Sequence, residues 1–415
     1  MPETVFVFDL DLTLLDTSAV ETLRKAQLWN EVRSNLHLVR TYPRRQEVAP
    51  HELPNLLREK GHKVGIVTSS PKWYAEHLLH SLKIPYDTLV AYGDTEQHKP
   101  DPAPLILARQ QLGCTEVDHC LYVGDDIIDF EAAYHAGMVS VGVSWGVRDL
   151  YEISSSAPDI FIDKPGLLLS DTPLMRLNYA GERAAGGKKF VLHWGSLLNV
   201  SDKPPSWTLG RYFQTADPRS GKSGLSQSIL ELKNSDEPAP VLGPAMGRCI
   251  ETLDWTPDFI VAVPPKPSQK RNRFEALLAE AAKSFADDIE LALDGLRCTK
   301  EVEDYKLKGP FERREAIEGV FESTRKWRGS KVLLVDDVIT TGATTDECID
   351  TLRASGALEV RVLAVGKDQR SYVWKECPAC GRRMKVRTNG QTGEKFWGCS
   401  GYPDHCTNTE RFEEV

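Results

Sequence analysis

The chain has 415 residues, of which 41% are hydrophobic and 27% are charged, and its formal net charge at pH 7 is −9. This length predicts two to three domains, and the composition is ordinary for a soluble globular protein. The net charge argues against a protein whose whole surface binds nucleic acid, although it does not exclude a local basic patch. No segment reads as a transmembrane span or a signal peptide, because the apolar start is short and acidic.

The first expected strand, Val5 to Phe8, ends in two acids, Asp9 and Asp11, which are followed by Thr13. Alternation along an extended strand end places Asp9 and Asp11 toward the same side. Such a pair suits an aspartyl-phosphate mechanism, in which one carboxylate attacks phosphorus and its neighbour moves the proton. A solvated turn is the alternative interpretation, because a lone Asp-x-Asp is common by chance.

Three downstream segments favour the catalytic interpretation. A second apolar strand, Val64 to Val67, leads into Thr68, whose hydroxyl and neighbouring amides suit a phosphoryl oxygen. Lys99 supplies a cation that would offset the charge of the phosphoryl group and of the nucleophile. A third strand, beginning at Leu121, ends before Asp125 and Asp129, whose oxygens suit Mg²⁺.

With these four motifs, residues 1–165 resemble the haloacid dehalogenase-like (HAD) hydrolases. The resemblance implies Asp9 as nucleophile and Asp11 as general acid/base, and the acid at position 11 favours a phosphatase. It also implies Thr68 as phosphate ligand, Lys99 as charge neutraliser, and a magnesium site formed by Asp9, Asp11, Asp125 and Asp129. The role of Asp126 stays ambiguous. The alternative is an HAD scaffold retained only for packing.

A short insert, roughly Thr17 to Arg45, has helical apolar spacing and predicts a small cap over this site. A small cap closes a site poorly, so either the substrate is large or another domain provides the lid. After this module the composition shifts, and residues 166–189 are expected to be a linker. Its glycine-rich end, Ala180 to Lys189, carries the strongest linker signal.

The second strong signal is an apolar run from Lys331 that ends in Asp336 and Asp337 and continues into a turn and a helix. A loop at a helix N-terminus offers free amide donors and the positive end of the helix dipole to a phosphate. The paired acids can accept hydrogen bonds from vicinal sugar hydroxyls. The site therefore suits ribose 5-phosphate, with hydroxyl donors and close backbone approach supplied by Thr340, Thr341, Gly342 and Thr344.

This run closely resembles the phosphoribosyl-pyrophosphate (PRPP) signature of type I phosphoribosyltransferases, and residues 190–370 are similar to the ComF-like branch. The resemblance implies a pyrophosphate loop after the strand at Phe259, with Lys266 at the phosphate, and a flexible catalytic loop containing Arg313. A solvated charge run is the alternative reading of the loop's basic residues. The predicted pyrophosphate loop, Lys266 to Phe274, lacks the glycine that this branch has after its arginine. This departure leaves open whether the domain is a catalyst or a regulator.

The third signal lies at residues 371–415, where two cysteine pairs predict a tetrahedral zinc site of Cys377, Cys380, Cys399 and Cys406. His405 is the competitor for the last ligand. The segment resembles the C-terminal zinc ribbons of bacterial type I topoisomerases, which implies single-stranded nucleic acid binding through basic side chains and through Phe396, Trp397 and Tyr402. The alternative is that these aromatic residues form the core of the ribbon.

The remaining cysteines are scattered and are expected to be thiols, which together with the paired cysteines favours a reducing cytoplasm. The sequence thus predicts two Rossmann-like, doubly wound α/β domains and a small β zinc ribbon, with Mg²⁺, Zn²⁺ and PRPP as ligands. We expect an enzyme of nucleotide metabolism: a phosphatase acting on a phosphorylated, nucleotide-like small molecule, fused to a phosphoribosyltransferase. The alternative is a nucleic-acid end-processing protein recruited by its ribbon, with a PRPP sensor. The sequence predicts no membrane partner and leaves the oligomeric state open.

Overall fold

The computed structural model divides the chain into two compact units. The first comprises Met1–Asn178 with His193–Gly195, and the second comprises Tyr179–Leu192 with Ser196–Val415. No helix in the described part of the chain is long and apolar enough to cross a membrane. The structure describes residues 4–44, 47–114, 119–147, 149–170, 178–189, 192–269, 271–285, 288–301, 316–389 and 392–412.

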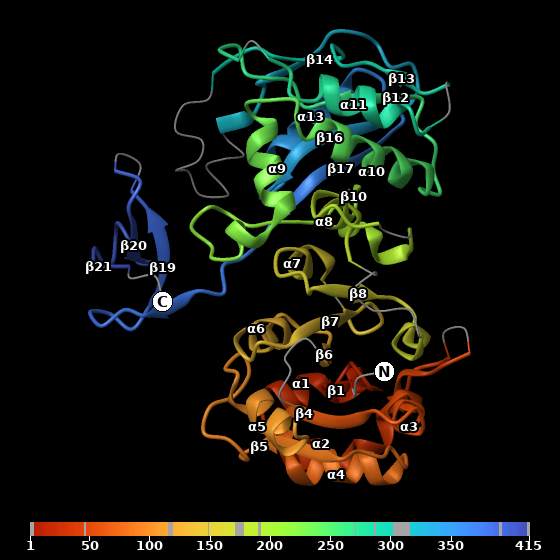
Figure 1. The fold of residues 1–415 in the computed structure, drawn as a ribbon, viewed down its shortest axis with the longest axis vertical. Coiled ribbons are helices and arrows are strands. Elements are labelled where there is room, and N and C mark those ends of the chain that lie inside the picture. Colours follow the sequence, from red (N-terminus) through yellow and green to blue (C-terminus); the bar gives the residue numbers. More distant parts are fainter. Residues whose placement is uncertain are drawn as a thin grey trace. The chain divides into compact units, whose positions relative to one another are not determined.

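The first unit contains a parallel sheet of six strands in the order β5-β4-β1-β6-β7-β8 (Figure 1, red to yellow). The central strand has the sequence Val-Phe-Val-Phe and is buried along its whole length, as expected where both faces of a parallel sheet are covered. The six strands are β1 (Val5–Phe8), β4 (Lys63–Pro71), β5 (Thr88–Tyr92), β6 (Cys120–Gly124), β7 (Val139–Val143) and β8 (Ile160–Ile162).

Alternate residues of β1 belong to two different hydrophobic cores. Phe6 and Phe8 pack in one buried cluster, whereas Val5 and Val7 pack in another. Because neighbouring side chains of a strand point to opposite faces, a core lies on each side of the sheet. The helices of this unit are α3 (Leu53–Glu59), α4 (Lys72–Ser81), α5 (Ala103–Gln111), α6 (Ile127–His135) and α7 (Leu150–Ser154), with 3₁₀ turns η3 (Pro50–Glu52) and η5 (Pro165–Leu169).

The insert after β1 is a small cap, as the sequence indicates. It has two short helices and a two-stranded antiparallel ribbon. Its second helix presents Trp29, which contacts Trp73 and Tyr74 of α4 edge-on. The cap elements are β2 (Leu15–Asp16), η1 (Ser18–Val20), α1 (Glu21–Lys25), α2 (Trp29–Ser34), η2 (Leu36–Leu38) and β3 (Arg40–Thr41).

The main sheet of the second unit has the order β13-β12-β16-β17-β10-β9, with β11 also pairing with β17 (Figure 1, green to blue). It is parallel except at its edge, where β9 and β10 form an antiparallel hairpin. The strands are β9 (Leu198–Asp202), β10 (Pro205–Thr208), β11 (Arg211–Tyr212), β12 (Phe259–Ala262), β13 (Glu290–Leu291), β16 (Lys331–Ile339) and β17 (Glu359–Asp368), with a separate pair β14 (Leu296–Cys298) and β15 (Phe321–Ser323).

The strand β16 repeats the arrangement of β1. Leu333 and Val335 pack in one core, and Val332 and Leu334 pack in the other. Two parallel sheets, each with a core on both faces, confirm the predicted fold class. The helices and turns of this unit are α8 (Ala180–Ala185), η7 (Trp194–Ser196), η8 (Ser220–Lys222), α9 (Gly224–Leu232), α10 (Ala239–Glu251), α11 (Glu275–Ala282) and α13 (Ala343–Ala354).

The interpretation of residues 180–189 as linker was wrong for the first six of them. They form α8, and Ala180 and Gly181 are buried. A Cβ on Gly181 would lie 2.7 Å from Leu209 Cβ, so the small residues permit close packing of the helix. The glycine and alanine content therefore reflects a tight helix contact. Part of the expected linker, residues 171–177, lies outside the described residues.

The C-terminal segment forms the small β-structure that was expected. Its four antiparallel strands are ordered β18-β19-β20-β21. Cys377, Met384 and Cys399 form its buried cluster, against which Trp397 packs. The strands are β18 (Trp374–Glu376), β19 (Arg383–Thr388), β20 (Lys395–Cys399) and β21 (Thr409–Arg411).

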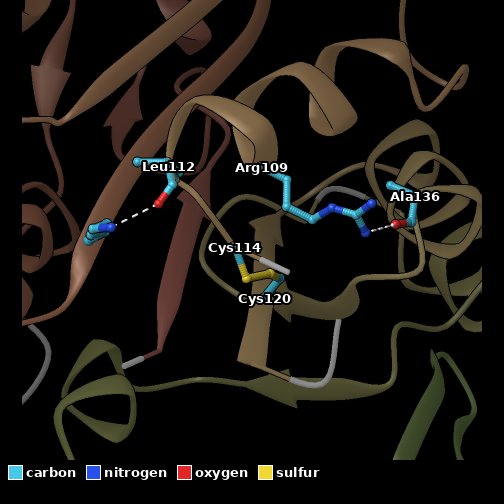
Figure 2. Close-up of a disulfide and its surroundings, with 6 residues drawn as sticks. Arg109, Leu112, Cys114, Cys120 and Ala136 are labelled. Carbon is cyan, nitrogen blue, oxygen red and sulfur yellow. Dashed lines mark hydrogen bonds between the residues drawn. A yellow bond between two sulfur atoms is a disulfide. The ribbon is translucent and has the colours of Figure 1, made fainter. Parts of the chain in front are cut away.

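Two of the cysteines expected to be thiols form a disulfide instead. Cys114 follows α5 and is bonded to Cys120, the first residue of β6 (Figure 2). Nearby, Arg109 donates a hydrogen bond to the carbonyl oxygen of Ala136 at 2.8 Å, and Lys63 donates one to that of Leu112 at 2.9 Å. Spacing along the chain gives no sign of such a bond, because the pairing depends on how the loop after α5 returns to the sheet.

Candidate active site

The predicted phosphatase residues meet where the strand order of the first sheet reverses. From β1 the chain continues to β4 and β5 on one side, and then crosses to β6 on the other. Ligands of open α/β sheets bind at such a point, beyond the carboxyl ends of the strands. Asp9 follows β1, and Asp125 follows β6. Asp129 lies in the first turn of α6, which starts directly after β6.

Three carboxylates form a compact buried cluster there. Oxygen atoms of Asp9, Asp125 and Asp129 all lie within 4.8 Å of one another. Burial raises the pKa of Asp9 to about 7, with smaller contributions from the charges of Asp129 and Asp11 and against the opposing effect of Lys99. Burial and the neighbouring carboxylates also raise the pKa of Asp125 well above its usual value. Three acidic groups are therefore concentrated at the carboxyl ends of these strands.

Lys99 is the cation placed within this cluster. Its side chain is 3% exposed, and its ammonium donates to Asp9 Oδ1 at 2.7 Å and to Asp129 Oδ1 at 2.6 Å. It also donates to the hydroxyl of Tyr122 at 2.9 Å. Although burial acts in the opposite direction, Asp129 and Asp9 raise the pKa of Lys99 well above its usual value. Lys99 is therefore a fixed positive charge beside the expected nucleophile.

Asp11 has a separate set of partners. Its carboxylate accepts hydrogen bonds from the hydroxyls of Ser70 and Tyr74, both at 2.7 Å, and from Thr68 at 3.4 Å. It also forms an ion pair with Arg24 of the cap at 2.7 Å. The sequence predicted Asp11 as a fourth magnesium ligand, but its side chain is not among the three carboxylates that cluster in the described residues.

Other polar residues orient this site. Thr13 donates to Asp125 Oδ1 at 2.8 Å. Asp126, whose role the sequence left ambiguous, is the N-cap of α6 and accepts from the backbone of Ile128. Sequence reasoning missed Arg24, Ser70, Tyr74 and Tyr122 as parts of the site. Ser70 lies two residues after Thr68 in the same motif, but the other three carry no local signal.

The site opens into a cavity of about 290 Å³. The catalytic candidates line it, and the cap contributes Glu21, Arg24, Lys25, Gln27 and Trp29. Tyr92 also lines it and stacks on His98, with ring centroids 4.1 Å apart. The small cap therefore covers part of the site.

The donor set fits a magnesium ion. Hard divalent cations take carboxylate oxygens as ligands. Three buried carboxylates lie together, and Lys99 contacts two of them. A dication would offset the remaining negative charge, so Asp9, Asp125 and Asp129 are the residues that would hold it.

The second sheet has an analogous site at its own reversal point, between β12 and β16. Asp336 is buried, and burial followed by the charge of Asp337 raises its pKa well above the usual value. Asp337 forms an ion pair with Arg273 at 2.6 Å, so the loop after β12 contacts the acids of β16. Lys266 lies exposed on that loop. The predicted catalytic loop with Arg313 falls in residues 302–315, outside the described residues.

The turn between β16 and α13 is the predicted phosphate loop. Gly342 has a positive φ of 82° and precedes α13, a conformation that favours glycine. The hydroxyl of Thr341 is buried, and the described residues offer it no hydrogen-bond partner. Thr340 lies in the turn before α13, and Thr344 is the second residue of that helix.

Sequence reasoning missed a lysine beneath this loop. Lys367 of β17 is buried and donates to the carbonyl oxygen of Thr340 at 2.7 Å. Burial lowers its pKa to about 8, against the opposing effect of Asp368. Lys367 pairs with Ile339, the last residue of β16, so its charge lies at the predicted phosphate loop that follows this strand.

The four predicted zinc ligands also come together. The sulfur atoms of Cys377, Cys380, Cys399 and Cys406 lie within 4.8 Å of one another. The Cys377–Cys406 and Cys380–Cys399 sulfur distances are 3.8 and 3.5 Å. Ligands about 2.3 Å from a tetrahedral zinc lie roughly 3.8 Å apart, so the cluster fits that metal.

Comparison with known families assigns two segments of the chain. Residues 27–143 match the family model described as haloacid dehalogenase-like hydrolase. Residues 275–383 match the phosphoribosyl transferase domain. The chain therefore carries an HAD-like segment and a phosphoribosyltransferase segment, as the motifs indicate.

Curated relatives match the HAD part. A phosphoglycolate phosphatase of Salmonella paratyphi A is 39% identical over 118 residues, which cover 28% of this chain and 46% of the relative. Pyrophosphatase PpaX of Bacillus velezensis is 32% identical over 127 residues, which cover 29% of this chain and 57% of the relative. The chain thus spans about half the length of these relatives.

A solved structure, that of a predicted phosphoglycolate phosphatase from Haemophilus somnus 129pt, is 21% identical to the chain. The match covers 42% of this chain and 99% of that structure, with a TM-score of 0.35.

Proposed function

We propose that residues 1–165 are a Mg²⁺-dependent phosphatase that acts through an aspartyl-phosphate on Asp9. The observation that carries this proposal is the buried cluster of Asp9, Asp125 and Asp129 around Lys99. The names of the HAD relatives, phosphoglycolate phosphatase and pyrophosphatase, support a small phosphorylated substrate. The cavity of about 290 Å³ suits such a molecule better than a polymer end.

In the first step, a carboxylate oxygen of Asp9 attacks phosphorus, and the bond from phosphorus to the leaving oxygen breaks. Asp11 gives a proton to that oxygen. In the second step, Asp11 takes a proton from water, whose oxygen attacks phosphorus and releases phosphate from Asp9. Thr68 binds a phosphoryl oxygen, and Lys99 offsets its charge. A bound Mg²⁺ reduces the repulsion between the phosphoryl group and the carboxylates.

The test is phosphate release in the presence of Mg²⁺ from nucleotides, PRPP, sugar phosphates, short phosphocarboxylates, p-nitrophenyl phosphate and phosphorylated oligonucleotides. Asp9→Asn is the blank. Release of phosphate from small molecules by the unaltered chain, and not by Asp9→Asn, supports the proposal. Release from oligonucleotide ends alone would favour the alternative, a nucleic-acid processing protein recruited by its ribbon. Absence of release from every compound would contradict a phosphatase.

For residues 190–370 we propose a PRPP-binding transferase domain related to the ComF-like branch. The support is the left-handed Gly342, the buried hydroxyl of Thr341, and the paired acids Asp336 and Asp337. Acids accept from the ribose hydroxyls, and the loop amides bind the 5-phosphate. Calorimetric titration with PRPP tests this proposal, and ribose 5-phosphate separates the contribution of the pyrophosphate. Because transfer would join or cleave a nucleoside 5-phosphate, nucleotides are the proposed link between the two sites.

For residues 371–415 we propose a zinc ribbon of the topoisomerase type. The sulfur geometry supports the metal. Trp397 packs against the core of the ribbon, which supports the packing interpretation for that ring, whereas Tyr402 is exposed. Zinc content of the purified chain tests the site. Cys399→Ser should lower it, and Cys298→Ser, which alters a cysteine outside the cluster, should not.

The cytoplasm is the location we propose, on the support of the four clustered thiols. The disulfide between Cys114 and Cys120 weighs against a reducing compartment. Titration of free thiols in protein isolated under rapid alkylation tests the redox state of that pair directly.

A further inference from the structure

Within the part of the chain that the structure describes, the cap contributes one arginine to the lining of the phosphatase cavity. Arg24 lies on α1, and its side chain is 14% exposed. Its guanidinium reaches Asp11 Oδ2 at 2.7 Å, the hydroxyl of Ser70 at 3.3 Å and that of Thr17 at 3.2 Å. A cap residue thus contacts the expected general acid/base.

These contacts oppose the first step of the proposed reaction, in which Asp11 must hold a proton and give it to the leaving oxygen. An ionised carboxylate only accepts hydrogen bonds, and the carboxylate of Asp11 is surrounded by donors. The hydroxyls of Ser70 and Tyr74 can turn their hydrogens away and accept a bond, but a guanidinium has no acceptor atom. When Asp11 holds the proton for the leaving oxygen it has lost its charge, so its ion pair with Arg24 is reduced to a hydrogen bond to a neutral acceptor, and Arg24 is drawn more strongly to another anion.

Arg24 also has unused donor capacity. Its Nε is buried, and within the described part of the chain no acceptor lies within hydrogen-bond distance of it. Glu21, the nearby acid on the same helix, is paired with Lys25 at 2.9 Å. An anion that takes over Arg24 would therefore come from a molecule in the cavity that Arg24 lines.

We propose that Arg24 is exchanged between Asp11 in the resting site and a second anionic group of the substrate. This inference rests on the proposed phosphatase function. The substrate class is then a small phosphomonoester with a carboxylate or a second phosphate a few bonds from the reacting phosphorus. Arg24 acts twice: it binds that group, and by leaving Asp11 it frees the carboxylate for proton transfer. A phosphomonoester without a second anion leaves Arg24 on Asp11 and reacts slowly.

Matched substrates test this proposal. Glycerol 3-phosphate and 3-phosphoglycerate differ by a hydroxymethyl group in place of a carboxylate. Propane-1,3-diol phosphate and its bisphosphate test a second phosphate in the same way. We expect the unaltered chain to prefer the more anionic member of at least one pair by about 10- to 100-fold in kcat/KM, the usual range for a charge-assisted hydrogen bond. The pair that shows the preference identifies the kind of anion.

Variants connect this preference to Arg24. Arg24→Gln should abolish the preference by raising KM for the compound that carries the second anionic group, and Arg24→Lys should restore part of it. Arg33→Gln is the matched control. This second cap arginine stacks over Trp73 at 4.4 Å and is not among the residues lining the cavity, so the preference should stay unchanged.

Equal turnover of both members of both pairs by the unaltered chain overturns the inference while leaving the phosphatase proposal intact, and this result does not depend on any variant folding. A preference that Arg24→Gln retains, in a variant that melts as the unaltered chain does, overturns it too. No phosphate release from any compound, including p-nitrophenyl phosphate, overturns both proposals.

Discussion

The two parallel sheets place acids at the same point of their topology but surround them differently. In the first unit, Asp9 and Asp129 share the ammonium of Lys99, which is deeply buried. In the second, Asp337 pairs with Arg273, which comes from a loop and is 22% exposed. Under the proposed functions, the carboxylate of the first site forms a covalent bond and needs a fixed counter-charge in place before substrate arrives. A site that only binds sugar hydroxyls can use a cation that ligand binding displaces.

The largest expected effect separates the two sites. Asp9→Asn removes the nucleophile but keeps the shape of the side chain, so phosphate release should fall by a factor of roughly 10⁴ or more. PRPP affinity, measured by calorimetry on the same variant, should stay unchanged. A parallel loss of PRPP binding would contradict the view that each sheet carries its own site.

The fixed cation of the first site should also matter for stability. Lys99→Met leaves the carboxylates of Asp9 and Asp129 buried without their ammonium, which costs about 3–5 kcal/mol for a broken buried pair. Urea unfolding should show this loss. Arg273→Met, the counterpart at the second site, should cost less than about 1 kcal/mol because its side chain is partly solvated. Equal costs would remove the distinction between the two cations.

The acids of the second site should influence affinity rather than chemistry. Asp337→Asn weakens the acceptor for a ribose hydroxyl, so PRPP affinity should fall about 10- to 100-fold. Calorimetric titration measures this change, and phosphatase activity on a compound other than PRPP serves as the control. An unchanged affinity would show that the ribose is bound elsewhere.

The smallest expected effect is a pH dependence of PRPP binding. Lys367 is charged below its pKa of about 8 and neutral above it. Because a cation beneath the phosphate loop attracts the anion, affinity should decrease severalfold as the pH rises through 8. Lys367→Met should remove this step, and a step that persists in the variant would have another origin.

The same lysine predicts the opposite trend for stability. Its ordinary pKa of 10.5 is lowered in the folded chain to about 8. Between these values the unfolded chain holds a proton that the folded chain has released, so the contribution of Lys367 to the free energy of unfolding rises with pH. Urea unfolding of the unaltered chain and of Lys367→Met over this range measures the difference.

The acidic residues at the ends of strands were predictable from the sequence, whereas the side chains that contact them from other elements were not. Val5 to Phe8 is apolar and ends in acids, so both the strand and its site were visible locally. Tyr74 and Tyr122 lie in ordinary apolar patterns, and only the packing of α4 and β6 turns their hydroxyls toward Asp11 and Lys99. Arg24 was equally hidden, and Arg273 was indicated only as a basic residue of the loop after β12 and not as the partner of Asp337, because a long flexible side chain can reach several places and tertiary contacts select one.

The linker interpretation failed for a related reason. Glycine and alanine signal flexibility when nothing packs against them, but at Gly181 a neighbouring residue, Leu209, occupies the space that a side chain would fill. The disulfide between Cys114 and Cys120 was also hidden, since cysteine spacing carries no information about loop conformation.

The burial of β1 on both faces has a consequence for how the proposed phosphatase can diversify. A substitution at Phe6 or Val7 disturbs one of two packed cores, so the strand that presents Asp9 tolerates little change. The cap, by contrast, exposes many side chains along residues 17–44. New substrate preferences are therefore most accessible through mutations in the cap, with the phosphoryl chemistry inherited unaltered beneath it.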